Sequence, residues 1–411
     1  MVANNGKLPL PLEGVRILDA THIVAGPFCS MILADMGAEV IKIERPGEGD
    51  RARRNRPRIE TPDGRSVAAR FLGINRNKKS VTLDLRDPRG LQVFHELIRV
   101  SEALLDNWGP GALRRLGLGY DELSKINPSL VYASITGYGD NEGLRGPYSN
   151  WPANNPCVQG MGGWMEVTGP PGAPPQMVGD NIGDSLPGLW TALGVVLALE
   201  TRRKTGLGQH VDMAMYDCMV AHTTSTMPFY QLTGKVIGRA RENMMSAQLA
   251  LKANDGYAVL AGAQEEGKWI KLWKLIGREE LLQDPHYLGQ GISGEFYFSA
   301  IAPAIEEWSQ HLSKWAVAEK LTALGFSMGV VQDQADLAQC PHLEARDMFV
   351  DAGDSLGGSF RTVNTPIHLT GCVDIPSRTP PLLGEDNQEI LCGIGGLTVE
   401  ELDQLRADGV V

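Results

Sequence analysis

The chain has 411 residues, of which 43% are hydrophobic and 21% charged, and its formal net charge is −11. This length is roughly two to three times that of a usual domain, so we expect one very large domain or two cores. The composition is typical of a folded globular protein and excludes the disordered and fibrous classes, while the acidic balance argues against a nucleic-acid surface on the scale of the whole chain.

Strand and helix patterns alternate over the first hundred residues. Apolar runs at 15–21 and 38–44 predict buried strands, and the segment between them, 27–37, carries the apolar face of a helix. These three elements form a βαβ unit. Such units build parallel sheets that are covered by helices.

The alternation continues toward residue 139. Strands are predicted at 79–85, 103–107 and 130–139, and a helix that begins with proline is predicted at 88–102. We therefore predict an α/β fold with a parallel sheet whose ligands lie outside the carboxyl ends of the strands. Neither standard glycine loop, GxGxxG or GxxxxGK[ST], follows the first strand, so neither of them holds a nucleotide here.

A turn-rich segment at 141–183 predicts a loop, and 185–203 is the strongest predicted helix. The helix has Asp or Ser at its cap, Pro187 in its first turn, basic residues at its end and Gly206 just after it. Farther along the chain, 250–263 has the pattern of two strands around an Asn-Asp-Gly turn.

Helical patterns at 268–276 and 300–325 follow that hairpin. We interpret this middle region as a smaller α+β domain that covers 225–330. The large domain then comprises 1–224, and the chain returns to it at 331–411.

The sequence gives no sign of a membrane or metal protein. The first residues lack the apolar core of a signal peptide, and the longest apolar stretch, about 189–199, is too short to cross a bilayer of roughly 30 Å. The six cysteines form no CxxC pair and the eight histidines are dispersed. We therefore expect a cytoplasmic protein with reduced thiols, no metal site and no membrane partner.

Asp184 is the residue that points most directly to chemistry. It stands at the start of the long predicted helix, where free N–H groups and the helix dipole stabilise negative charge, so we expect it to stay ionised. An ordinary N-cap fits the same pattern and is the commoner use of aspartate there. Asp180 is a second carboxylate nearby, in a setting typical of a turn.

Basic residues gather at and after the predicted strands of this acidic protein. Guanidinium groups are common phosphate ligands, so the set predicts a polyphosphate site, although solvated surface charge explains any single member equally well. The set comprises Arg45, Arg51, Arg53, Arg54, Arg56, Arg58, Arg76, Lys78, Lys79, Arg86, Arg114 and Arg115. Trp108 either stacks on a base or packs in the protein.

Eight stretches of the chain, taken in order, resemble the class III CoA-transferases, the CaiB/BaiF family. They are LEGVRILDATHIVAGPF, LADMGAEVIKIERPGEGD, NRNKKSVTLDLRDPRG, LLDNWGPGALRRLGL, NPSLVYASITGYG, GDSLPGLWTALGVVLALETRRKTGLGQHVDMAMYD, NDGYAVLAG and PPLLGEDNQEIL. They span about residues 12 to 395. Within the family, YSNWPANNPCVQGMGGWMEVTG resembles the L-carnitine CoA-transferase branch more than the formyl-CoA:oxalate branch.

This resemblance implies a fold, an assembly and a set of substrates. The fold would be a large Rossmann-like domain that binds coenzyme A (CoA), with a smaller α+β domain in the middle of the chain. Two chains would form a homodimer of interlocked rings. CoA and acyl-CoA would be substrates rather than a permanently bound cofactor, small carboxylic acids would be the other substrates, and no nucleic acid or membrane would be a partner.

The resemblance also implies the residues of the site. The family motif Asp-x-x-x-Gly, before a helix that ends in KTGxGQ, is matched by Asp184, Gly188, Lys204, Thr205, Gly206, Gly208 and Gln209, so Asp184 takes the catalytic position. The CoA contacts fall on His22, Val24, Ala25, Arg45, Leu83, Asp84, Leu85, Arg86, Asn107, Trp108, Gly109, Arg115, Pro152, Ala153, Asn154 and Asn155.

A carboxylate in the place of Asp184 suits this chemistry. It would attack the thioester of an acyl-CoA to give an aspartyl mixed anhydride and then an aspartyl-CoA thioester, which the acceptor acid attacks in turn. No proton needs to move, so a lone aspartate without a histidine base suffices, provided that backbone N–H groups hold the developing oxyanion.

The chain departs from the family's oxalate enzymes at two places. Val24 stands where some members have Gln, and residues 239–248 occupy the place of a glycine-rich loop. Both differences argue against oxalate or formate as substrates.

Two other functions stay open. An α-methylacyl-CoA racemase of the same superfamily needs a histidine base about where this chain has Asn154, and an amide cannot remove a proton. A CoA-binding protein without catalysis is the other alternative, and the intact Asp184 argues against it.

Overall fold

The computed structural model describes residues 7–60, 66–170, 172–239, 248–261, 265–288, 296–351, 360–375 and 377–411. The segment 239–248, noted above as a departure from the oxalate enzymes, lies almost entirely outside these residues. The chain divides into two compact units. The larger comprises Met1–Trp164, Met177–Thr223 and Leu343–Val411, and the smaller comprises Met165–Gln176 and Thr224–His342.

A six-stranded parallel sheet forms the centre of the larger unit, with the strand order β5-β2-β1-β6-β7-β8. The predicted parallel α/β architecture is therefore confirmed. The strands are β1 (Arg16–Ala20), β2 (Glu39–Glu44), β5 (Lys78–Thr82), β6 (Ala103–Asp106), β7 (Val131–Thr136) and β8 (His210–Ala214). The order reverses between β1 and β6, which is where open sheets of this kind bind ligands.

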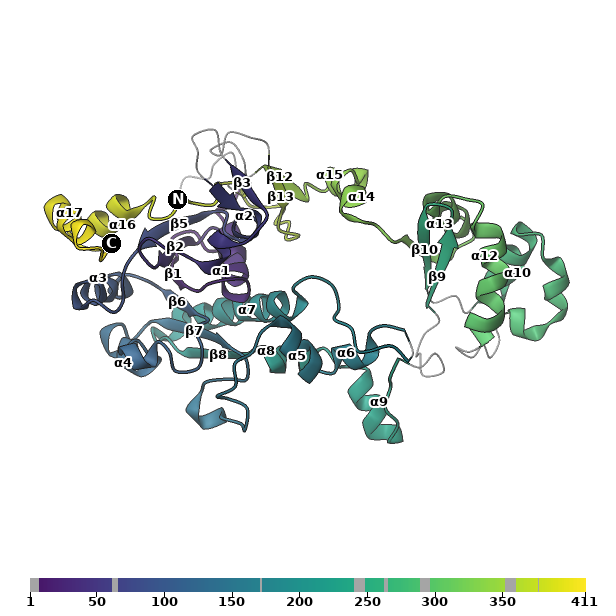
Figure 1. The fold of residues 1–411 in the computed structure, drawn as a ribbon, viewed down its shortest axis with the longest axis horizontal. Helices are drawn as coiled ribbons and strands as arrows, with labels where there is room; N and C mark the ends of the chain where they lie inside the picture. Colours follow the sequence, from purple (N-terminus) through teal and green to yellow (C-terminus); the bar gives the residue numbers. More distant parts are fainter. Residues whose placement is uncertain are drawn as a thin grey trace. The chain divides into compact units, whose positions relative to one another are not determined.

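Two hydrophobic cores lie against the two faces of this sheet because its strands are apolar on both sides. One core joins Ile17 of β1 to α1 (Ala25–Asp35) and α7 (Ile182–Thr205). The other joins Leu18 of β1 to α3 (Pro88–Arg99) and the C-terminal helix α17 (Val399–Ala407). Figure 1 shows that last helix, in yellow, on the same side of the sheet as α3, so the C-terminal residues complete the core to which β1 contributes.

Short elements complete the larger unit. The helices are α2 (Ala69–Ile74), α4 (Tyr120–Ile126), α5 (Asn155–Met161), α6 (Trp164–Val167), α8 (Met215–Ala221), α15 (Pro341–Ala345) and α16 (Asn387–Gly393), of which α6 and α15 run across the boundaries between the units. The strands β3 (Arg58–Glu60) and β4 (Ser66–Ala68) pair with each other, as do β12 (Phe349–Asp351) and β13 (Arg361–Val363).

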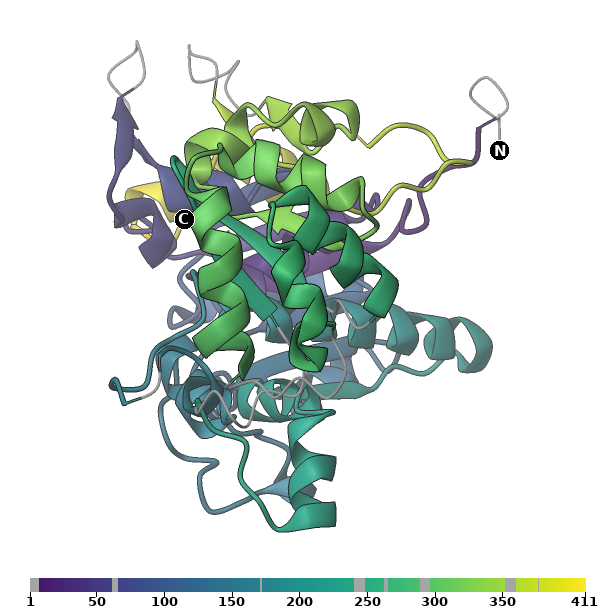
Figure 2. The same cartoon turned by 90° about the vertical axis from the view of Figure 1, so that its right-hand side faces the viewer.

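The smaller unit has an antiparallel sheet with the order β11-β10-β9. The predicted hairpin is confirmed, because β9 (Gln248–Ala253) and β10 (Gly256–Ala261) pair across an Asn-Asp turn, and β11 (Ser327–Val330) lies beside β10. Figure 2 turns the helices of this unit, in green, toward the viewer. They are α9 (Thr226–Thr233), α10 (Glu266–Leu275), α12 (Ala302–Ser309), α13 (Lys314–Thr322) and α14 (Gln334–Ala338), and Trp269 and Trp273 stack in the core.

The long helix α7 begins earlier than the sequence predicts. It starts at Ile182 with Asn181 as its N-cap, so Asp184 is a residue of the first turn and not the cap. The physical reason is that Asn155 accepts the N–H of Gly183 at 2.8 Å from outside the helix, a contact that no local pattern reveals. The predicted end is confirmed, since Gly206 follows with φ 76°.

By length and composition, α7 is the one described helix that could cross a membrane, with a mean hydropathy of 1.5. A core helix of a soluble protein passes the same test. Thr191, Val195 and Ala198 of α7 are buried in the core that it shares with α1 and the sheet.

Candidate active site

Asp184 lines a cavity of about 560 Å³ at the carboxyl ends of β1, β6 and β7. The wall is formed by the loops after those strands, by the segment before α5 and by the first turn of α7. This position is the crevice beside the reversal of strand order, where the fold predicts a ligand. The Asp184 carboxylate forms no hydrogen bond or ion pair with any residue that the structure describes, so it is available to a substrate.

Two close approaches hold Asp184 in place. A Cβ atom on Gly183 would lie 2.7 Å from the backbone oxygen of Asn155, and one on Gly188 would lie 2.6 Å from the backbone oxygen of Ala25. Only glycine fits at such distances, so the first turns of α7 are pressed against α5 and α1. Asn155 also donates to the carbonyl of Asp180 at 3.0 Å, which fixes the chain just before the helix.

Burial raises the pKa of the Asp184 carboxyl above that of an exposed aspartate. Desolvation raises the pKa of the Asp184 carboxyl to about 6, with a contribution from Asp180 in the same direction, while the Arg70 guanidinium lowers it. The helix N-terminus therefore does not keep this pKa at the ordinary value of an exposed aspartate. The carboxylate is the major form at pH 7, but its titration is moved close to neutral pH.

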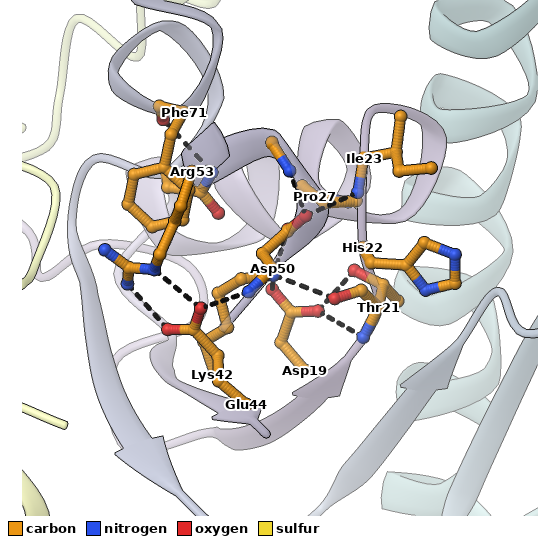
Figure 3. A network of polar contacts seen from close by, with 12 residues as sticks. Asp19, Thr21, His22, Ile23, Pro27, Lys42, Glu44, Asp50, Arg53 and Phe71 are labelled. Carbon is orange, nitrogen blue, oxygen red and sulfur yellow. Dashed lines mark hydrogen bonds and ion pairs between the residues drawn. The ribbon is translucent and has the colours of Figure 1, made fainter. Parts of the chain in front are cut away.

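The loop after β1 forms the opposite part of the wall in a strained backbone conformation. Ile23 has φ 70°, which is rare for a β-branched residue and is tolerated where the surroundings enforce it. Asp50 accepts its N–H at 3.0 Å (Figure 3). Asn107 binds both the N–H and the carbonyl of His22 at 2.8 Å. No side chain caps the helix α1 that follows, so N–H groups of its first turn lie uncapped beside Val24 and Ala25 at the cavity wall.

A network of buried ion pairs fixes the position of this loop. Lys42 donates to the carbonyl of Thr21 at 2.8 Å and forms an ion pair with Asp50 at 2.9 Å, and Asp19 lies 3.9 Å from Lys42 and 3.1 Å from Lys78. The charged side chains of this set are completely buried. Burial raises the pKa of Asp19, but Lys42 and Lys78 outweigh it and hold that pKa well below its usual range.

The structure corrects part of the predicted polyphosphate set. Lys78 pairs with Asp19, Arg53 pairs with Glu44 at 2.6 Å, and Arg76 pairs with Asp35. These three cations are structural, because each is held by a buried carboxylate of another element.

A second cleft, of about 440 Å³, adjoins the cavity and is lined by several exposed arginines. It shares His22, Arg51, Trp108 and Gly109 with the cavity, so the two form neighbouring parts of one groove. The other arginines on its wall are Arg45, Arg54 and Arg86. The indole N–H of Trp108 donates to the carbonyl of Ala20 at 2.6 Å, which fixes the ring where the two parts meet.

Most residues predicted as CoA contacts come together in this groove. The cavity contains His22, Val24, Ala25, Asn107, Trp108, Gly109, Pro152, Ala153, Asn154 and Asn155 together with Asp184. The cleft adds Arg45 and Arg86. Asn154 also accepts the N–H of Cys157 as the cap of α5, and its side chain is an amide that has no basic function.

Four predicted contacts lie outside both parts of the groove. The side chains of Leu83 and Leu85 are buried in the core against α3, because they alternate inward after β5. Asp84 accepts the N–H of Arg86 at 2.9 Å, and Arg115 donates to the carbonyl of Pro110 at 3.2 Å. Of the LDLR stretch, only the arginine therefore reaches the groove.

Three arginines of the groove were not among the predicted contacts. Arg51 and Arg54 belonged to the basic set, but nothing in their surroundings distinguished them from their neighbours. Arg70 was not singled out at all, because it lies in the short helix α2 and belongs to no motif. Only the folded chain shows that it lines the cavity of Asp184.

Comparison with known proteins gives a consistent result. The sequence pattern of CoA-transferase family III matches residues 12–387. The chain is 33% identical to a succinyl-CoA–D-citramalate CoA-transferase of Chloroflexus aurantiacus over 98% of both chains, and 35% identical to a formyl-CoA:oxalate CoA-transferase of Streptomyces avermitilis over 97% of this chain and 99% of the relative. A crystal structure of a CaiB/BaiF family protein from Brucella suis superimposes with a TM-score of 0.83 at 31% identity, over 94% of this chain and all of the other.

Proposed function

The chain belongs to CoA-transferase family III, and from this premise we propose that it transfers CoA reversibly from an acyl-CoA donor to a carboxylic acid through covalent intermediates on Asp184. One observation carries this proposal. The unpartnered carboxylate of Asp184 lies in a cavity that adjoins an arginine-lined cleft, which suits a thioester in the cavity and the phosphates of its coenzyme in the cleft.

The proposed reaction balances without an external base. An oxygen of Asp184 attacks the thioester carbonyl, the carbon–sulfur bond breaks, and CoA leaves as the thiolate, giving an aspartyl mixed anhydride. The thiolate then attacks the aspartyl carbonyl and releases the donor acid as its carboxylate. The acceptor carboxylate attacks the resulting aspartyl-CoA, and the thiolate returns to the new acyl group, which regenerates Asp184.

Charge builds on a carbonyl oxygen in each of these steps. The uncapped first turn of α1 and the positive end of its dipole lie at the wall that Val24 and Ala25 share with Asp184. We assign the stabilisation of the oxyanion to this turn. The Ile23 conformation, which Asp50 holds, sets where the turn begins.

The racemase alternative requires a base on each side of the substrate. Among the described residues of the cavity wall, Asn154 has an amide side chain, which cannot remove a proton, and His22 has the only imidazole. Burial lowers the pKa of that imidazole. Exchange of the α-proton of a 2-methylacyl-CoA with deuterated solvent distinguishes the two functions. We expect CoA transfer and no exchange, whereas rapid exchange without transfer would support the racemase.

The names of the relatives suggest which acids to test first. Relatives at 33%, 32% and 30% identity are named for succinyl-CoA with D-citramalate, mesaconate and glutarate. We propose succinyl-CoA as the first donor, with a panel of mono- and dicarboxylic acceptors. L-carnitine belongs in that panel because residues 148–169 resemble the L-carnitine branch. Oxalate belongs there because Val24 and residues 239–248 differ from the oxalate enzymes, and we therefore expect oxalate to be a poor acceptor.

We further propose a homodimer, supported by an exposed apolar row on α7. Leu189, Leu193 and Leu197 follow one another at helical spacing and are exposed, as are Trp190 and Val196 beside them. The opposite face of α7 is already packed on α1 and the sheet. A second copy of the chain is the partner that the family resemblance implies, and two interlocked rings would not separate on dilution.

Leu193→Glu is therefore expected to prevent formation of the stable dimer. Light scattering across about a hundredfold dilution should give a constant dimer mass for the wild type and monomer or aggregate for the variant. Val100→Glu is the matched control, since Val100 is 44% exposed and Leu193 is 46% exposed, and it should stay dimeric. A wild-type chain that dissociates reversibly on dilution would contradict the interlocked arrangement.

A further inference from the structure

Arg70 is a cation that the fold holds beside the candidate nucleophile. Its neighbours Phe71 and Leu72 are completely buried and anchor the short helix α2, and the Arg53 guanidinium stacks on the Phe71 ring at 3.7 Å. Arg70 itself is exposed and lines the cavity of Asp184. It is close enough to lower the pKa of the Asp184 carboxyl, against the larger effect of burial.

Arg70 has no ion-pair or hydrogen-bond partner among the residues that the structure describes. The arginines near it in sequence are different, because Arg53 pairs with Glu44 and Arg76 pairs with Asp35. Neither of those arginines lines the cavity. The fold thus pairs these two arginines with carboxylates and leaves Arg70, like Arg51, on the cavity wall without such a partner among the described residues.

The position of Arg70 also separates it from the arginines suited to phosphate. Arg45, Arg54 and Arg86 line the adjoining cleft and not the cavity, and Arg51 lines both. Arg70 lines only the part that contains Asp184. A cation in that place faces the acyl group rather than the nucleotide of a bound acyl-CoA.

We propose that Arg70 binds the free carboxylate of a dicarboxylic acyl group, and hence that the enzyme is selective for dicarboxylic acids and their CoA monothioesters. This inference rests on the function proposed above. With a simple fatty acyl group in the cavity, the guanidinium would be partly desolvated without a counter-ion, which is unfavourable. A second carboxylate supplies a charge-assisted, bidentate partner and leaves the first one for Asp184.

The selectivity applies to both half-reactions. Donor and acceptor react in turn with the same carboxyl group, so each acyl group occupies the same place between Asp184 and Arg70. Both acids are therefore expected to carry two carboxylates.

Isotope exchange between an acyl-CoA and its own free acid tests this inference without knowledge of the natural acceptor. The probes are succinyl-CoA with labelled succinate and butyryl-CoA with labelled butyrate. The far end of the acyl chain is a carboxylate in the first pair and a methyl group in the second. At pH 8, the wild type should exchange succinate about 100-fold more efficiently than butyrate, and Arg70→Gln should remove most of that preference. Arg70→Lys, which keeps the charge but loses the bidentate geometry, should retain part of it.

Two further variants serve as controls. Arg51→Gln should lower both exchanges by a similar factor, because Arg51 also lines the cleft proposed for the coenzyme. Arg99→Gln, which alters an exposed pair with Glu96 on α3, should change neither. In Arg70→Gln, the acid limb of the pH–rate profile for butyrate exchange should also move to higher pH, because the wild-type guanidinium lowers the pKa of Asp184. Asp180, which raises that pKa, and His22 and Arg51, which line the cavity, are unchanged in this variant.

Three results would overturn the inference. They are equal losses of both exchanges in Arg70→Gln, no loss of either, and a wild type that exchanges butyrate as well as succinate. Failure of the proposed function would look different, because neither exchange would occur in the wild type and Asp184 would carry no acyl group.

Discussion

Asp184→Asn is expected to lower the rate of CoA transfer by about four orders of magnitude or more, because an amide cannot form the anhydride that we propose for both half-reactions. Affinity for free CoA, measured by calorimetry, should stay close to that of the wild type, since the arginines proposed to bind its phosphates line the adjoining cleft. The folded chain should be at least as stable at pH 7. Burial raises the pKa of this carboxyl to about 6, so the cost of ionising it in the folded state sets in above the unfolded pKa and is fully present above the folded pKa, including at pH 7. The amide removes that cost.

Asp180→Asn is the matched control for this variant. Asp180 is exposed, lies just before α7 and does not line the cavity. Its replacement should leave the turnover rate almost unchanged. Activity within about tenfold of the wild type in Asp184→Asn, with a large loss in Asp180→Asn, would transfer the nucleophilic role to Asp180.

Asp19→Asn is expected to reduce the free energy of unfolding by about 3–5 kcal/mol, because it leaves the buried ammonium groups of Lys42 and Lys78 without their shared carboxylate. Chemical denaturation at pH 7 measures this change. Lys42 also holds the carbonyl of Thr21 in the cavity loop, so transfer activity should fall together with stability. The contribution of Asp19 is present above its unfolded pKa and is lost as the pH falls toward the lowered folded value.

Asp374→Asn provides the comparison for a surface ion pair. Asp374 pairs with Lys7 at 2.8 Å, but its side chain is 94% exposed, so its removal should change stability by less than about 1 kcal/mol. Equal and small effects of the two substitutions would show that the buried network does not support the fold in the way described.

The sheet was predictable because its strands are short, apolar on both sides and separated by clear helix and turn signals. The segments 15–21, 38–44 and 103–107 match β1, β2 and β6 within one or two residues. The edge strand β8 was not predicted, because most of its residues are only half-buried and give a weaker pattern. The start of α7 was missed because the N–H of Gly183 is accepted by Asn155, a residue of another element.

The site was predictable only in part, and the reason is non-local pairing. Family motifs identified Asp184 and most of the cavity wall, but they also assigned Leu83 and Leu85, whose side chains are in the core. No pattern along the chain distinguishes Lys78, which is paired and buried, from Arg70, which lines the cavity. That distinction depends on where distant carboxylates lie after folding.

The covalent state of Asp184 tests the central claim most directly. After incubation with succinyl-CoA and then hydroxylamine, the tryptic peptide 146–202, which has no internal lysine or arginine, should contain a hydroxamate that fragmentation assigns to Asp184 and not to Asp180. Borohydride in place of hydroxylamine should reduce the aspartyl-CoA thioester at the same position. An unmodified Asp184 in an enzyme that is transferring CoA would contradict the account.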